Sequence, residues 1–116
     1  MANELAPDLN AIFHALADPK RRQVIRALTA GPADVSALAA PFDLALPTFL
    51  KHLKVLEDAG LVVTQKRGRI RHCALRPEAL TAAERWIGEH ALRWDAKLDG
   101  LEKYLAHQSA RKDRTR

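Results

Sequence analysis

The 116-residue chain contains one cysteine, so it cannot form a disulfide within itself, which fits a reducing cytoplasm. It has no apolar run approaching the roughly 20 residues that a membrane-spanning helix requires. The opening segment MANELAPDLN has no basic stretch followed by an apolar core. We therefore expect no secretory signal and a cytoplasmic location.

Sequence signals of catalysis are also missing. We recognise no glycine-rich phosphate loop, no Ser/His/Asp or Cys/His set, and no pair of carboxylates in a plausible cleft. The sequence therefore predicts that the protein is not an enzyme and uses no cofactor. Aromatic residues make up 5% of the chain, and the basic stretch has only Phe49, which the core requires. This argues against an RNA reader, because such proteins stack bases on aromatic rings.

Positive charge is concentrated in one stretch of the chain. Residues 46–76 contain seven lysines and arginines against two acidic residues, a net charge of +5. Residues 1–45 and 77–110 are slightly acidic, and residues 111–116 carry a net +3. Such a patch is typical of a protein that binds a polyanion, above all nucleic acid. The alternative is a solvated basic surface without a partner.

Helical periodicity and capping residues predict three short helices in the first 45 residues. Apolar residues recur at helical spacing over residues 9–16. Asp18 and Pro19 then have the residue types of an N-cap and a first helical position, and Gly31 closes this second helix. Asp34 is placed to cap a third helix through VSALAA.

The basic stretch begins with a fourth predicted helix, over about residues 46–59. Phe49, Leu53 and Leu56 recur at i, i+4 and i+7, so we expect this face to pack on the core. The lysines of the helix then fall on the outward face. The segments LVVTQ and RIRHCAL next predict a two-stranded hairpin over about residues 61–75, with four cations around its KRG turn.

One long helix is predicted for about residues 78–106. A large apolar residue recurs every seven positions along it: Leu80, Ile87, Trp94 and Leu101. This stripe packs either on its own domain or on a second subunit. We favour the second subunit, because the stripe has more apolar surface than a small body can cover. Residues 108–116 are polar and basic, and we expect a disordered tail there.

Helix, short turn, helix with a basic outer face, then basic hairpin is the order of a winged helix-turn-helix. The sequence therefore predicts a mainly α fold with a two-stranded β-wing, in a single domain spanning residues 1–107. In this fold one face of the recognition helix packs on the body while the other enters the major groove of double-stranded DNA. Cations of the helix and the wing then neutralise phosphates on either side.

In these segments the chain resembles the ArsR family of bacterial repressors. The resemblance is carried by ALADPKRRQVIRAL, LPTFLKHLKVLEDAGLV and RGRIRHCALRP, in this order and spacing, and covers about residues 8–105. It implies a homodimer built on the first and last helices that represses its own operon and is released by a signal. The family's subgroup with a long, Trp-containing last helix and no metal motif is the most similar.

Candidate site residues follow from the pattern together with this resemblance. The candidate DNA-contacting residues are Leu46, Pro47, Thr48, Leu50, Lys51, His52, Lys54, Lys66, Arg67, Arg69 and Arg71. The candidate dimer-interface residues are Leu9, Ile12, Phe13, Ile87, Trp94, Leu98, Leu101 and Leu105. A two-fold dimer of this kind would bind two half-sites of a near-palindromic operator.

The chain departs from the family at both metal sites that the resemblance would imply. Asp34 and Ser36 stand where the metal sensors have a Cys-x-Cys pair, and Ala37 follows in place of an acidic residue. Asp95 and Lys97 are the nearest match to an Asp-x-His pair on the last helix, with a cation at the ligand position. Because thiolates are missing and a lysine cannot serve as this ligand, we expect no metal site.

Three residues each allow two interpretations. Leu46 and Leu50 stand at positions that read bases in relatives. Both either turn inward and extend the core, which is the simpler interpretation, or touch thymine methyl groups. Cys73 is either a small inert strand residue or a thiol sensor beside His72.

Two questions about function stay open at this stage. A winged-helix module for protein contacts is the alternative to a DNA-binding regulator, although such modules typically lose the cations that this chain retains. The releasing signal is an organic ligand between subunits, a redox change at Cys73, or nothing beyond protein concentration. An autorepressor is the simplest interpretation.

Overall fold

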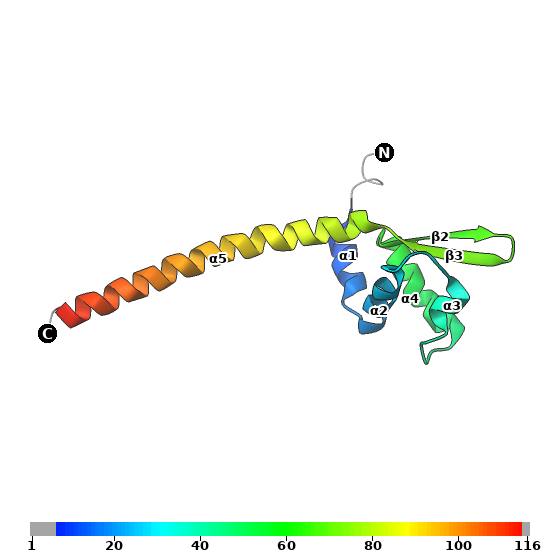
Figure 1. Cartoon of the computed structure of the whole chain (residues 1–116), viewed down its shortest axis with the longest axis horizontal. Helices are drawn as coiled ribbons and strands as arrows, with labels where there is room; N and C mark the ends of the chain where they lie inside the picture. Colours follow the sequence, from blue (N-terminus) through cyan, green and yellow to red (C-terminus); the bar gives the residue numbers. More distant parts are fainter. Residues whose placement is uncertain (1–6, 115–116) are drawn as a thin grey trace. The chain divides into compact units, whose positions relative to one another are not determined.

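A computed structural model of the chain describes residues 7–114, with the side chains of residues 7–110 (Figure 1). Its backbone separates into two compact units that divide between residues 83 and 84, where the sequence predicted a single domain. In chain order the elements are α1 (Leu9–Leu16), α2 (Pro19–Leu28), β1 (Ala33–Asp34), α3 (Val35–Ala39), α4 (Leu46–Asp58), β2 (Val62–Arg67), β3 (Ile70–Leu75) and α5 (Pro77–Arg114).

Aspartate side chains begin the first three helices. The Asp18 carboxylate accepts the backbone N–H groups of Lys20 and Arg21 at 2.8 and 3.1 Å, and Pro19 follows it as the first residue of α2. Asp34 accepts the Ser36 N–H at 3.0 Å and caps α3 in the same way. Both caps confirm the predicted helix starts, because each satisfies amide groups that the first turn leaves without a helical partner.

The α4 helix buries the predicted apolar face. Phe49, Leu53 and Leu56 are almost completely buried, which confirms the expected i, i+4, i+7 stripe. The helix ends in a left-handed turn at Gly60, whose φ is 77°. There the Leu61 N–H donates to the Leu56 carbonyl at 3.0 Å and directs the chain into β2.

The wing is a hairpin of β2 and β3, which projects beyond the helices of the first unit (Figure 1). Gly68 takes a φ of 64° in its tight turn, a conformation that glycine adopts without strain. The sheet has a third strand that the sequence analysis did not predict, since β1 pairs with β3 and aligns Ala33 with Cys73. A strand of two residues is too short to show an alternating pattern.

The core of the first unit combines residues from nearly every element. Its largest fully buried side chains are Ile12, Val24, Phe49, Leu56, Leu61, Val62 and Cys73. The first two turns of α5 belong to it as well, because Ala79 and Ala83 are buried and Leu80 packs against the cluster. This core therefore holds α4 and the base of the wing in one body.

The second unit is the remainder of α5. The helix continues to Arg114, so the end expected near residue 106 and the disordered tail from residue 108 are wrong for the described residues; residues 115–116 lie outside them. No glycine or proline follows Gly100 to interrupt the helix. From Glu84 to Ala110 every side chain except Gln108 is exposed in the single chain. Among the described residues, no helix has the length and apolar content to cross a membrane.

Candidate nucleic-acid interface

The turn before α4 is anchored in the core of the first unit. Phe42 packs against the core cluster, and its ring lies 5.4 Å from the ring of Phe49 at an angle of 45°. The α4 helix itself begins after Ala45, whose side chain makes no capping hydrogen bond. Packing on Phe42 and burial of its apolar face therefore hold this helix in place.

The outward face of α4 carries exposed side chains. Lys51 and Lys54 are exposed, and so are Pro47 and Thr48 in the first turn. The Lys54 ammonium lies 3.5 Å from the Asp58 carboxylate, and the two side chains are 74% and 64% exposed. An exposed pair at this spacing contributes only about 0.3–0.5 kcal/mol, so a DNA phosphate can compete for Lys54.

Leu46 and Leu50 differ in exposure, although the simpler of the two interpretations turned both of them inward. Leu50 is half-buried and packs against the core, as that interpretation predicts. Leu46 instead keeps 53% of its surface exposed, so the inward interpretation is wrong for this residue. Leu46 is the first residue of α4 and has no preceding helical turn to pack on. Of the two leucines, it has the surface that a thymine methyl group could contact.

His52 is held on the flank of α4 by Arg21, a residue that the sequence analysis did not single out. Because arginine has only donors, Arg21 Nη1 donates to His52 Nδ1, at 3.2 Å. The same guanidinium donates through Nε to the Ala15 carbonyl at 2.7 Å and through Nη2 to the His14 carbonyl at 3.1 Å. Arg21 thus joins the end of α1 to α4. No local pattern indicates a partner 31 positions away.

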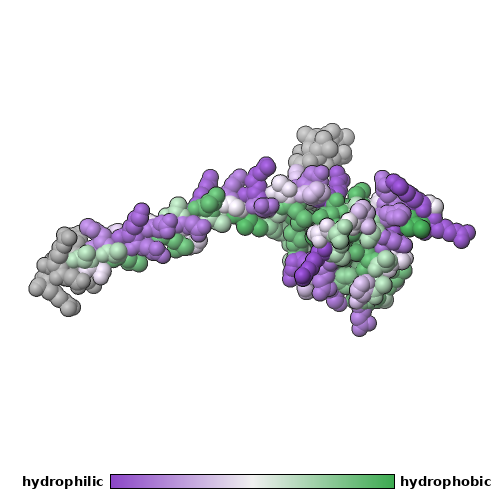
Figure 2. Space-filling view, in the orientation of Figure 1, coloured by the Kyte–Doolittle hydropathy of each residue, from purple (hydrophilic) through white to green (hydrophobic). Residues whose placement is uncertain are grey.

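The wing presents the remaining predicted cations. Lys66 and Arg67 in β2, Arg69 in the turn and Arg71 in β3 are all exposed. Figure 2 shows hydrophilic side chains covering the tip of the hairpin. Lys66 and Arg71 are direct partners across the strands, and like charges in such positions destabilise a sheet. An anion bound at the wing would relieve this repulsion.

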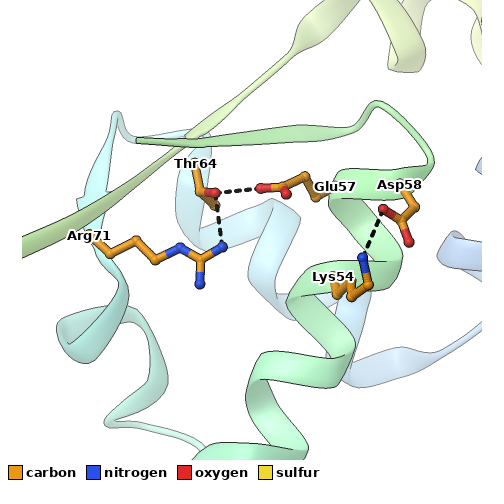
Figure 3. Close-up of polar contacts among 5 residues, drawn as sticks. All are labelled: Lys54, Glu57, Asp58, Thr64 and Arg71. Carbon is orange, nitrogen blue, oxygen red and sulfur yellow. Dashed lines mark hydrogen bonds and ion pairs between the residues drawn. The ribbon is translucent and has the colours of Figure 1, made fainter. Parts of the chain in front are cut away.

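A polar contact joins α4 to both strands of the wing (Figure 3). The Thr64 hydroxyl donates to the Glu57 carboxylate, and Arg71 Nη2 donates to the same hydroxyl oxygen at 3.2 Å. Glu57 and Thr64 were not among the predicted site residues. Neither lies on an apolar stripe or in a capping position, so sequence patterns carried no signal for them.

Cys73 is fully buried, in line with Thr64 on the neighbouring strand. Burial, with a smaller contribution from the Glu57 carboxylate, raises the pKa of its thiol to about 11, and Arg71 partly opposes this shift. A protonated, inaccessible thiol favours the inert interpretation over the redox sensor.

The positions that correspond to metal ligands in the metal-sensing members of the family have other surroundings here. Asp34, at the position of a family ligand, uses its carboxylate to cap α3. Among the described residues, no three His, Cys, Asp or Glu side chains are grouped so that they could hold a metal ion.

The candidate dimer residues divide between the two units. Ile87, Trp94, Leu98, Leu101 and Leu105 lie along α5 with exposed fractions between 37% and 62%. Leu9 and Phe13 of α1 are half-buried. Ile12 is completely buried within its own chain, so its assignment to an interface is wrong. It lies with Ala15 on the face of α1 that packs on the core.

Comparison with known proteins finds a helix-turn-helix family and several transcriptional regulators. A family described as a helix-turn-helix domain matches residues 16–65. The crystal structure of an ArsR family transcriptional regulator is 54% identical, with a TM-score of 0.72 over 75% of this chain and 90% of that chain. The transcriptional repressor SdpR of Bacillus subtilis is 25% identical over 68% of this chain and 88% of its own length.

A further similar structure is a homodimer. It is the homodimeric winged helix-turn-helix DNA-binding domain of a possible ArsR-family regulator from Mycobacterium bovis, determined in solution. That domain is 25% identical, with a TM-score of 0.55 over 77% of this chain and 80% of its own.

Proposed function

The chain belongs to the ArsR family of winged helix-turn-helix transcriptional regulators, and from this premise we propose that it is a homodimeric repressor of its own operon. It binds double-stranded DNA at a near-palindromic operator. The observation that carries this proposal is the set of exposed cations on α4 and the wing, Lys51, Lys54, Lys66, Arg67, Arg69 and Arg71, within one packed unit. Among the described residues, only Lys54 of this set lies in an ion pair.

The recognition helix, with Ala59 at its C-terminal end, enters the major groove. Thr48 and Lys51 face outward from its first two turns and contact base edges or phosphates, together with Pro47 and His52. Leu46 supplies an apolar contact at the start of the helix. Leu50 contributes chiefly by packing, because it is partly buried and lies against the core.

The wing, over residues 61–75, binds the DNA backbone beside the groove. Its four exposed cations lie near one tight turn and have no base-reading geometry of their own, so we assign them to phosphates. Each phosphate that they neutralise should steepen the dependence of the logarithm of affinity on the logarithm of salt concentration by about 0.9. Affinity therefore depends strongly on salt.

A second copy of the chain covers the α5 stripe. Ile87, Trp94, Leu98, Leu101 and Leu105 share one helical face, and water is an unfavourable partner for so much apolar surface. In the first unit, we assign Leu9 and Phe13 of α1 to contacts with the second copy. Two-fold symmetry then presents two recognition helices to two half-sites.

The regulator works without a metal ion and without a catalytic step, in the cytoplasm where its DNA is. The donor set supports this, since Asp34 is a helix cap and Lys97 is a cation at the other ligand position. Release from the operator then follows a ligand bound between the subunits or a fall in protein concentration. The buried Cys73 thiol makes redox release the weaker alternative.

Titration of labelled duplexes by fluorescence anisotropy tests the proposal. The duplexes are the region upstream of the gene and a scrambled control, each at two salt concentrations. We expect tight binding to the first, weaker binding to the second, and a steep loss of affinity with salt. Lys51→Ala and Arg69→Ala should weaken binding, whereas Lys103→Ala, an equal charge change on α5, should not. No binding to either duplex would instead favour a protein-interaction module.

A further inference from the structure

One chain of hydrogen bonds crosses the junction between α4 and the wing. It begins at Glu57 in the last turn of α4, passes through the Thr64 hydroxyl in β2 and ends at Arg71 in β3 (Figure 3). A hydroxyl has one proton to donate, and Thr64 donates it to the Glu57 carboxylate. Its oxygen is thereby left to accept from Arg71, at 3.2 Å.

The surroundings of Glu57 and Thr64 make the hydrogen bond between them stronger than a surface pair, while the bond from Arg71 is exposed. Glu57 and Thr64 are half-buried, and Thr64 lies opposite the fully buried Cys73. The acceptor in this hydrogen bond is the Glu57 carboxylate, and hydrogen bonds to charged groups are about twice as strong as those between neutral groups. Glu57 and Arg71 also line a shallow hollow at the α4 side of the junction, together with Leu50, Leu53 and Lys54.

The outer part of the wing has little else to hold it. From Gln65 to Arg71 every side chain of the hairpin is exposed, whereas Val62 and Cys73 at its base are buried. The backbone ladder joins the two strands to each other but leaves the angle between the hairpin and α4 undetermined. Arg71 is a cation of the wing, and it is connected to Glu57 of the recognition helix through the Thr64 hydroxyl.

We propose that Glu57 and Thr64 are positioning residues for DNA binding, which hold Arg71 and the wing at a set angle to the recognition helix. The helix and the wing then meet the major groove and the flanking phosphates together. Arg71 keeps further guanidinium N–H groups to donate to a phosphate while Nη2 is bonded to Thr64. This inference rests on the proposed function, because it assumes that the surface binds DNA.

Substitutions at Thr64 test the proposal without changing the charge of the surface. Thr64→Val keeps the branched shape of the side chain and removes the hydroxyl, while Thr64→Ser keeps the hydroxyl. We expect Thr64→Val to weaken operator binding roughly tenfold and to lower the salt slope by about 0.9, and Thr64→Ser to stay within about twofold of the wild type. Arg71→Ala should cause a similar loss, and adding Thr64→Val to it should cause none further.

Amide hydrogen exchange in the absence of DNA provides an independent measurement. Thr64→Val should accelerate exchange in the outer residues of β2 and β3 while α2 exchanges as in the wild type, and Thr64→Ser should do neither. The proposal is overturned if Thr64→Val binds the operator like the wild type, or if its effect adds fully to that of Arg71→Ala. If the wild type binds no DNA, the proposed function fails, and exchange alone then decides whether Thr64 holds the wing.

Discussion

At the scale of single residues, two leucines on α4 have different roles because one turn of helix separates them. Leu46 is the first residue of the helix and is more than half exposed. Leu50 lies one turn later, where Phe49 and Leu53 beside it are buried, and most of its surface is covered. A substitution at Leu46 should therefore affect DNA contacts, and one at Leu50 should affect folding.

We expect Leu46→Ala to alter base preference while the free energy of unfolding changes by less than about 0.5 kcal/mol. Leu50→Ser should instead lower the free energy of unfolding by about 1–2 kcal/mol, because most of the leucine side chain is covered by the core. Urea unfolding measures stability, and titration with operator variants in which thymines are replaced measures preference. An equal loss on operator and random DNA for Leu46→Ala would contradict the base contact.

Cys73 is expected to be unreactive in the folded protein. Its thiol is buried and its pKa is raised from 9.0 to about 11, so almost no thiolate forms at pH 8. A chromogenic disulfide reagent should label the urea-unfolded chain quickly and the native chain only as fast as it opens. A pKa raised on folding also means that stability is retained below pH 9 and falls as pH rises towards 11. Fast labelling of the native protein would restore the redox interpretation.

At the scale of elements, the helix caps are the strongest local signals. Asp18 illustrates them, since its carboxylate accepts two backbone N–H groups at the start of α2. Burial alone would raise the pKa of this carboxyl group, but the hydrogen bonds from Arg21 and Lys20 outweigh it and lower the pKa below 3.8. The cap therefore stabilises the fold above that pH, and its contribution is lost as the pH falls and the carboxylate is protonated.

Asp18→Ala should lower the free energy of unfolding by about 0.5–2 kcal/mol at pH 7. The difference from the wild type should shrink as the pH falls below about 4, because the protonated wild type has lost its ionised cap. Asp43→Ala is the control, since it removes an exposed carboxylate outside the helices. Urea titrations at pH 7 and pH 3 measure both effects. A difference that is independent of pH would show that the charge of Asp18 does not matter.

At the scale of the whole molecule, the apolar stripe of α5 is the feature that a single chain leaves unsatisfied. Successive members of the stripe from Ile87 to Leu105 are seven, four, three and four residues apart, which keeps them on one face of the helix. Leu92 is also exposed but lies off this face. Figure 2 shows hydrophobic and hydrophilic side chains side by side along the helix. Substituting Leu98, on the stripe, and Leu92, off it, therefore tests whether the stripe itself, rather than exposed apolar surface in general, forms the dimer interface.

Leu98→Glu should convert the dimer to a monomer at micromolar concentration and abolish tight operator binding, because the charge would be buried between subunits. Leu92→Glu makes the same chemical change off the stripe and should leave a dimer. Sedimentation velocity distinguishes the two outcomes. A Leu98→Glu protein that remains dimeric would place the interface elsewhere.

The winged helix-turn-helix, most of its elements and the exposed cations of α4 and the wing could be predicted from the sequence. The α4 stripe of Phe49, Leu53 and Leu56 is buried as periodicity requires, and Asp18 and Asp34 cap the helices as their residue types indicate. The end of α5 was misplaced because residues after Gly100 contain neither a stop signal nor a strong pattern. The short strand β1 was missed because its partner, β3, lies far along the chain.

The sequence by itself determined where helices begin, which faces are apolar and where charge gathers, because caps, periodicity and charge density act within a few residues. Only the tertiary structure decided that Ile12 is core and Leu46 is exposed, since burial depends on what packs from elsewhere in the chain. It also decided that Arg21 holds His52 and that Thr64 joins Glu57 to Arg71. Such hydrogen bonds need distant segments placed within about 3 Å, a condition that the packed core creates and local patterns do not encode.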